Sequence, residues 1–134
     1  MRYVYELTIP ADTSITDPAT GQARLVTGRI RQIEIAFPPG PAAMVKVVIL
    51  DRLLQISPAN SEMYHAWDDY TEVFSMNYKL DDPEPTLTLS GWSVDTKYSH
   101  KITFRFDVVP KSGDEKAVLM AQMLAAPVLI SRGE

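Results

Sequence analysis

The sequence predicts an all-β domain, an antiparallel jelly-roll-like β-sandwich of about seven or eight strands. Short segments of alternating apolar and polar residues recur along residues 1–110, separated by prolines, glycines and aspartates, with no helical pattern between them. Long polar segments follow Pro10 and Pro58, as the crossing connections of a Greek key or jelly roll require. An immunoglobulin-like sandwich is the second choice, and the cysteine–tryptophan–cysteine framework of antibody domains is absent.

The first half of the chain contains several strand patterns. Residues 3–9 alternate until Pro10 ends them, and the polar residues 11–27 indicate a long loop or hairpin. Residues 28–37 alternate again and run into the sequence Pro-Pro-Gly-Pro, which cannot continue a ladder. Residues 44–50 are apolar on both faces apart from one lysine, which is typical of a strand central to two packed layers.

The second half repeats the strand pattern. A short strand ends at Pro58 and an irregular polar-aromatic segment follows it. Residues 70–80 resume the alternation, although Glu72 stands in the apolar phase. Residues 86–92 form a further strand, and residues 100–108 alternate best of all, with His100 in phase with the buried face. These elements complete the predicted sandwich.

The C-terminal segment has a different character. Ser112 and Glu115 fit a capping box, and strong helix formers continue to Pro127. This predicted helix is apolar almost all the way round, whereas a helix on a monomer normally shows a polar face. We therefore divide the chain into a sandwich domain, residues 1–110, and an apolar helix and tail, residues 111–134, that acts as an assembly arm.

The apolar side chains of this arm define a predicted oligomer interface. Its members are Val118, Leu119, Met120, Met123, Leu124, Val128, Leu129 and Ile130. Two alternatives stay open, since the helix could instead pack in cis across the open end of the sandwich or touch a membrane.

Composition excludes several classes of function. The chain has 134 residues, a formal net charge of −4 at pH 7 and no cysteine. The negative charge argues against nucleic-acid binding through a basic patch, and the lack of cysteine excludes disulfides and thiolate chemistry. The N-terminus alternates like a strand, and no segment reaches the length of a transmembrane helix. We therefore expect no transmembrane segment and no secretion by a signal peptide.

No residue pattern identifies a reaction, so we expect a protein that is not an enzyme and has no catalytic residues, cofactor or metal. His65 lies near Asp68 and Asp69, which are metal-ligand types, but a polar loop with two aspartates is usually solvated. The Gly-x-Ser-x-Gly turn of hydrolases is absent, and the glycines are too scattered to form a phosphate-binding loop.

Aromatic residues in loop-like segments are a second kind of candidate. Aromatic faces bind apolar faces of ligands such as sugars, while neighbouring polar groups fix the orientation of the ligand. Alternatively, large aromatic side chains simply plug the ends of a sandwich. The ligand platform predicted on this basis consists of Tyr64, Trp67, Trp92 and Tyr98.

Two turns, with the strands beside them, carry a family resemblance. In GRIRQIEIAFPPGP, the strand with Ile33 and Glu34 runs into the turn at residues 37–40. In GWSVDTKYSHKITFRF, a polar turn leads into the last strand. The residues of this stretch that carry the resemblance are Trp92, Asp95, Thr96, Tyr98 and His100. Together with the strand that ends in TIP, these stretches resemble small single-jelly-roll structural proteins of bacterial viruses and related mobile elements. The resemblance spans Tyr3 to about Pro110.

The resemblance implies a structural role. We expect a non-enzymatic virion- or capsid-type subunit that self-assembles through apolar surfaces and its C-terminal helix, and that binds itself and other structural subunits. Such a protein would assemble in the host cytoplasm and end in the virion. The alternative is a β-sandwich module that binds carbohydrate or another ligand through its loop aromatics.

Overall fold

The computed structural model describes residues 1–60, 62–93 and 96–111. Asp95 and the predicted interface side chains of residues 118–130 lie outside the described residues. The strands are β1 (Arg2–Ile9), β2 (Ala19–Arg24), β3 (Gly28–Phe37), β4 (Val45–Asp51), β5 (Leu54–Ser57), β6 (Tyr70–Leu80), β7 (Thr86–Ser93) and β8 (His100–Pro110).

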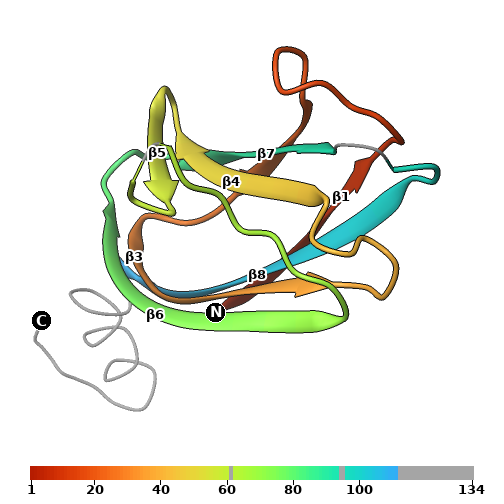
Figure 1. Ribbon diagram of the computed structural model, residues 1–134. Coiled ribbons are helices and arrows are strands. Elements are labelled where there is room, and N and C mark those ends of the chain that lie inside the picture. The colour runs from red at the N-terminus through yellow and green to blue at the C-terminus, as the bar shows by residue number, and fades with distance from the viewer. Residues whose placement is uncertain (61, 94–95, 112–134) are drawn as a thin grey trace, which may run out of the picture.

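The strands form two antiparallel four-stranded sheets that pack face to face (Figure 1). Sheet A has the order β1-β8-β3-β6 and sheet B the order β2-β7-β4-β5. The first strand thus pairs with the eighth, the second with the seventh, the third with the sixth and the fourth with the fifth. A long hairpin folded over on itself gives this pairing, which defines a jelly roll. The predicted fold class is confirmed.

The core lies between the sheets and is built by the inward-facing side chains of every strand. The largest side chains without exposed surface include Phe104, Phe106, Ile33, Ile35, Leu87 and Leu89. Gly91 leaves room for a core side chain of the opposite sheet, because a Cβ atom there would overlap the side chain of Ile9. A glycine in this strand interior is therefore required by packing.

Two strand predictions had different outcomes. Residues 45–51 are the predicted central strand, since β4 lies between β7 and β5. Residues 19–24 are a strand rather than part of a long loop. They form an edge strand in which Ala23 alone is buried, so no apolar alternation marks them in the sequence.

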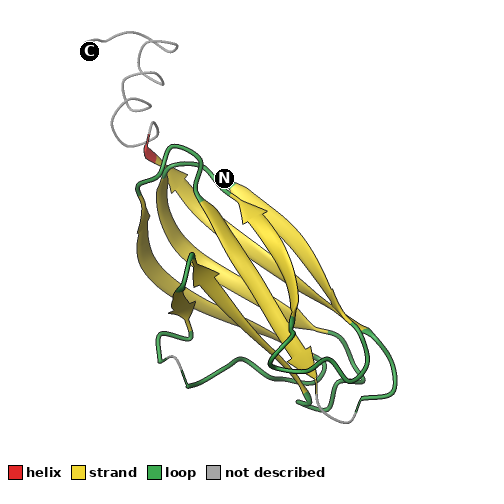
Figure 2. Ribbon diagram, turned by 90° about the horizontal axis from the view of Figure 1, so that it is seen from above, coloured by secondary structure: helices red, strands yellow, loops and turns green. Residues whose placement is uncertain are grey.

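The connections between strands differ at the two ends of the sandwich, as Figure 2 shows from above. At one end, which we call the loop end, lie the long connections: residues 10–18, 38–44, 58–69 and 96–99. At the other, the turn end, lie residues 25–27, 52–53 and 81–85, together with the N-terminus and the end of β8. No helix in the described ranges has the length and hydropathy needed to cross a membrane.

Candidate functional site

The loop end gathers exposed apolar side chains. Twelve large hydrophobic side chains are exposed in the described part of the chain, and seven of them belong to the loop end or to the first residue of β6. The seven are Ile15, Met44, Met63, Tyr64, Trp67, Tyr70 and Tyr98. Their concentration at one end makes that end the candidate binding region.

Hydrogen bonds hold the loops of this end against one another. The backbone N–H of Asp12 donates to Oγ1 of Thr96 at 3.1 Å, and the N–H of Thr13 donates to Oγ of Ser93 at 3.0 Å. The Ser93 hydroxyl in turn donates to the carbonyl of Pro10 at 3.1 Å. The first loop is therefore fixed to the chain around the end of β7.

A carboxylate joins two further loops. Oδ1 of Asp68 accepts hydrogen bonds from the backbone N–H groups of Gly40 and Ala42, each at 2.9 Å. This turn has left-handed backbone at Gly40 (φ 119°) and Ala42 (φ 49°), which costs free energy at a non-glycine residue. The two charge-assisted bonds to Asp68 stabilise that conformation. Asp68 therefore serves the turn rather than a metal with His65.

Two residues of the predicted ligand platform meet on the outer face of sheet B. The ring centroids of Tyr64 and Trp92 lie 6.1 Å apart at 79°, an edge-to-face contact. Lys46, which pairs with Trp92 across β4 and β7, places Nζ 5.0 Å from the Tyr64 centroid. The interpretation of Trp92 as a plug for the end of the sandwich is therefore wrong, because Trp92 lies outside the sheet.

The other two platform residues belong to different clusters. Trp67 contacts Tyr70, with ring centroids 4.8 Å apart, and its Nε1–H donates to Oε1 of Glu72 at 2.7 Å. Tyr98 is 75% exposed, so it does not plug the core, and none of the described rings contacts it. The four predicted aromatics therefore do not form one continuous platform.

A buried chain of hydrogen bonds closes the open side of the sandwich between β5 and β6. Nε2 of His65 lies 2.9 Å from Oγ of Ser57, and Nδ1 lies 2.9 Å from Oε1 of Glu72. A neutral imidazole satisfies both contacts by donating from Nδ1 and accepting the serine proton at Nε2. This series of hydrogen bonds therefore links sheet B to sheet A through the side chain of His65.

This order of serine, histidine and carboxylate is also that of a catalytic triad. Ser57 is 2% exposed and His65 8% exposed, so a substrate cannot reach the hydroxyl in this structure. His65 also stacks on Phe74 and exchanges backbone hydrogen bonds with Val47. The arrangement acts as a clamp on the fold. Glu72, the acidic residue in the apolar phase of residues 70–80, was the signal for it in the sequence.

A groove of about 560 Å³ separates two of the loops. Pro39, Gly40 and Met44 line one side, and Thr96, Tyr98 and His100 line the other. Both turns that carry the family resemblance thus meet here. His100 is in phase with the buried face of β8 as predicted, but its Nδ1 is buried without a hydrogen-bond partner among the described residues.

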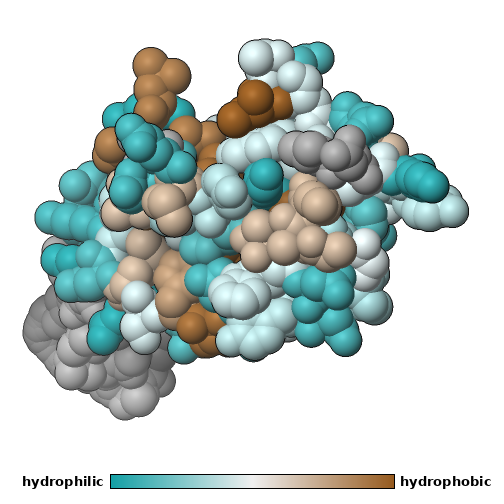
Figure 3. Space-filling view, viewed as in Figure 1, coloured by the Kyte–Doolittle hydropathy of each residue, from teal (hydrophilic) through white to brown (hydrophobic). Residues whose placement is uncertain are grey.

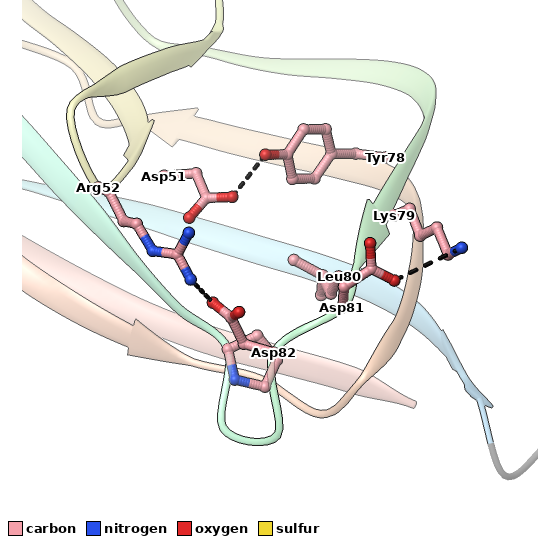
Figure 4. A pocket seen from close by; sticks show the side chains of 8 residues that line it. Asp51, Arg52, Tyr78, Lys79, Leu80, Asp81 and Asp82 are labelled. Atoms are coloured by element: carbon pink, nitrogen blue, oxygen red, sulfur yellow. Dashed lines mark hydrogen bonds and ion pairs between the residues drawn. The ribbon is translucent and has the colours of Figure 1, made fainter.

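A smaller pocket of about 170 Å³ at the turn end is lined by charged side chains (Figure 4). The Tyr78 hydroxyl donates to Oδ2 of Asp51 at 2.5 Å, Arg52 pairs with Asp82, and Lys79 pairs with Asp81 at 3.5 Å. Burial, and then the hydrogen bond to Asp51, raise the pKa of Tyr78 to about 12. The carboxylates drawn in Figure 4 therefore all have partners. No group of three potential metal ligands occurs within the described ranges.

Comparison with known proteins assigns no family. No family model matches the chain, and no curated protein matches its sequence. Among solved structures, that of tomato aspermy virus has 12% identity and a TM-score of 0.39, with 83% of this chain and 80% of that chain covered. The Yersinia pseudotuberculosis-derived mitogen has 7% identity and a TM-score of 0.37, with 81% and 86% covered.

A mutant of the carbohydrate-binding module CBM29-2 has 8% identity and a TM-score of 0.34, with 80% of each chain covered. These three proteins have unrelated functions, and the likenesses are too low to transfer any of them.

Proposed function

We propose that this protein is a non-enzymatic structural subunit of virion or capsid type, which self-assembles through the apolar side chains of its loop end. The observation that carries the proposal is the concentration of seven exposed large hydrophobic side chains at that end. The loops that present them are tied together by hydrogen bonds, so little conformational freedom is lost when a partner binds.

The family resemblance supports the viral part of the proposal. Its two turns, at residues 37–40 and 96–100, line the same groove of the loop end. Residues that lie far apart in the chain but together on the surface are expected to serve one contact. On this proposal the protein assembles in the host cytoplasm and is located in the virion.

The test measures the mass of the assembled protein. We expect the full chain to form oligomers in sedimentation and light-scattering experiments, and closed or regular particles by electron microscopy. A triple variant, Ile15→Ser, Met44→Ser and Tyr98→Ser, should lower the assembled mass, because it removes apolar surface from three loops.

The matched control is Leu53→Ser. Leu53 is 98% exposed, but it lies in the β4–β5 turn at the opposite end, where the hairpin projects from the surface in Figure 3. This variant should assemble like the parent. A full-length chain that stays monomeric across micromolar and millimolar concentrations would overturn the proposal.

The C-terminal segment supplies a second predicted assembly contact. The full chain with Leu119→Glu and Leu124→Glu should lose mass if residues 118–130 bury against another subunit, because each change places a charge in an apolar contact. An unchanged mass would assign assembly to the sandwich alone.

A second candidate function, binding of carbohydrate or another ligand, is favoured by the cluster of Tyr64, Trp92 and Lys46. Here two aromatic rings and an ammonium group lie together on the outer face of sheet B. Rings give a sugar apolar contact, and the polar groups fix its orientation.

A glycan array tests this candidate. If the candidate is right, the parent chain is retained on some glycans and Trp92→Ala loses that retention, whereas Trp67→Ala, which alters the neighbouring ring pair, keeps it. No retention of the parent chain removes the candidate.

A further inference from the structure

Strand β6 is a long edge strand whose outer side lacks a neighbour. It runs for 11 residues and pairs with β3 on one side. No backbone hydrogen bond joins its other side to a described residue. The backbone N–H and C=O groups on that side are therefore available to a further strand.

Residues 70–76 of this edge carry neither a proline nor an outward-pointing charge. The whole strand contains no proline, and from Tyr70 to Tyr78 its one charged residue is Glu72. The carboxylate of Glu72 points inward, where it accepts hydrogen bonds from His65 and Trp67. Edge strands are normally guarded by free charges, prolines or shortness. By contrast β5, an edge strand of sheet B, is protected by its short length of four residues.

Only the first half of β6 is straight. Ser75 and Tyr78 of β6 pair with Gln32 and Ile30 of β3. Two residues of β6 thus lie between these pairs where β3 has one, which is a bulge at residues 76–77. Figure 1 shows β6 straight along the lower edge of the molecule before it bends sharply upward at the left. A second straight strand can therefore pair with residues 70–76 only.

We propose that this half of β6 pairs antiparallel with β6 of a second copy, across a two-fold axis at Val73. In this register Val73 faces the second copy's Val73, Thr71 faces Ser75, Glu72 faces Phe74, and Tyr70 faces Met76. The inference deepens the proposed function, on which it rests, because it names one contact between subunits and its symmetry.

The register is self-complementary. Val73 is 54% exposed and Tyr70 50% exposed, and each gains an apolar neighbour on pairing. Thr71 and Ser75 are exposed hydroxyl residues that can bond across the strands. No like charges face each other. A shift of the axis to Glu72 would place two carboxylates opposite each other and is disfavoured.

A single cysteine tests the register, since the chain has none of its own. Opposed Cα atoms in antiparallel strands lie about 4.5–5.5 Å apart, within the span of a disulfide. Val73→Cys should form a disulfide-linked dimer under mild oxidation. Ser75→Cys is the matched control, because Ser75 faces Thr71. It should not link to itself, but it should link to Thr71→Cys when the two are mixed.

Charge exchange tests the contact without oxidation. Val73→Lys and Val73→Glu should each lose the dimer by repulsion across the axis, with circular dichroism unchanged, and a mixture of the two should recover it. Unchanged assembly of Val73→Lys would overturn the inference, as would equal self-linking by Ser75→Cys. So would a Val73→Cys thiol protected from alkylation in the monomer, which would show another segment of the chain on this edge.

The two proposals fail in different ways. Loss of assembly in the loop-end triple variant, with all Val73 variants behaving like the parent, would remove the two-fold contact and keep the proposed function. A parent chain that is monomeric at every concentration would remove both.

Discussion

The loop end and the turn end close the same two sheets, but different side chains meet solvent at each. At the loop end, exposed apolar and aromatic side chains stand on loops whose backbone N–H groups donate hydrogen bonds to Asp68, Thr96 and Ser93. At the turn end, short turns carry exposed charges, and there Arg52 pairs with Asp82 while Asp81 pairs with Lys79. Its exposed large apolar residues among those described are Met1 at the N-terminus and Leu53 and Leu54 in one hairpin.

The comparison of the two ends indicates which polar interactions contribute most to the stability of this fold. Surface ion pairs such as those of the turn end stabilise a fold little, since water and salt screen them. The hydrogen bonds of His65 to Ser57 and Glu72 are largely buried, so their loss costs more. The bonds to Asp68 are exposed and serve mainly to fix the turn at residues 40–42. Four variants can break or sharpen this comparison, and they are ordered below by expected effect.

The largest effect is expected for His65→Ala. The substitution leaves Ser57 and Glu72 without their buried partner and removes the ring that stacks on Phe74. We expect a loss of about 2–4 kcal/mol of unfolding free energy, measured by urea denaturation. Tyr98→Ala at the exposed rim of the loop end is the control and should match the parent. An equally stable His65→Ala protein would contradict the clamp.

A smaller effect is expected for Asp68→Ala, which removes the acceptor of two backbone N–H groups in the turn at residues 40–42. We expect a loss of about 1 kcal/mol and faster amide hydrogen exchange at Gly40 and Ala42. Asp68→Asn retains a carbonyl acceptor and should recover most of the loss. Equal behaviour of the two variants would show that the carboxylate oxygen does not hold the turn.

At the turn end, Tyr78 predicts a pH dependence. Its pKa rises from 10.0 in the unfolded chain to about 12 in the folded protein, so folding favours the neutral phenol. The stabilisation is complete below pH 10 and is lost as the pH rises to about 12. The difference in unfolding free energy between the parent and Tyr78→Phe should shrink over this range.

Absorbance titration of tyrosinate gives an independent measurement. The Tyr78 hydroxyl should ionise late in the parent, and this late ionisation should be missing from the titration of Tyr78→Phe. In Asp51→Asn it should ionise earlier, because the accepting carboxylate is gone. A titration in which Tyr78→Phe loses an early-ionising tyrosine would contradict the assignment.

The smallest effect is expected for Arg52→Ala. Its pairing with Asp82 raises the guanidinium pKa, but the side chain is 73% exposed. The unfolding midpoint in urea should not change measurably, at low or high salt. A clear salt-dependent loss would show that the turn end also depends on its charges, and the contrast between the two ends would weaken.

The sequence predicts the strands well because core strands alternate. Alternation of apolar and polar residues predicts β3 and β8, and apolar residues on both faces predict β4. β2 was missed because an edge strand with one buried residue carries almost no such signal. The jelly-roll order itself was favoured from loop lengths, and the pairing of β1 with β8 bears it out.

The site could be predicted only in part. Loop aromatics were identified as a group, and Tyr64, Trp67 and Tyr98 lie in connections of the loop end, whereas Trp92 belongs to strand β7. Their partners were not predictable. Glu72 binds His65 and Trp67 only because the segment before β6 crosses from one sheet to the other. Such contacts depend on the path of a loop, which no periodicity encodes.

One backbone hydrogen bond fixes the place of the last described residue, Lys111. The N–H of Lys111 donates to the carbonyl of Thr27 at 2.7 Å, next to Gly28, so the chain leaves the sandwich from a fixed point at the turn end. A C-terminal arm that reached the loop end of another copy would make a heterologous, head-to-tail contact. Such contacts build rings or open filaments, whereas the β6 contact is isologous and ends at two. Combining both would join rings or filaments through two-fold contacts, all from a single kind of subunit.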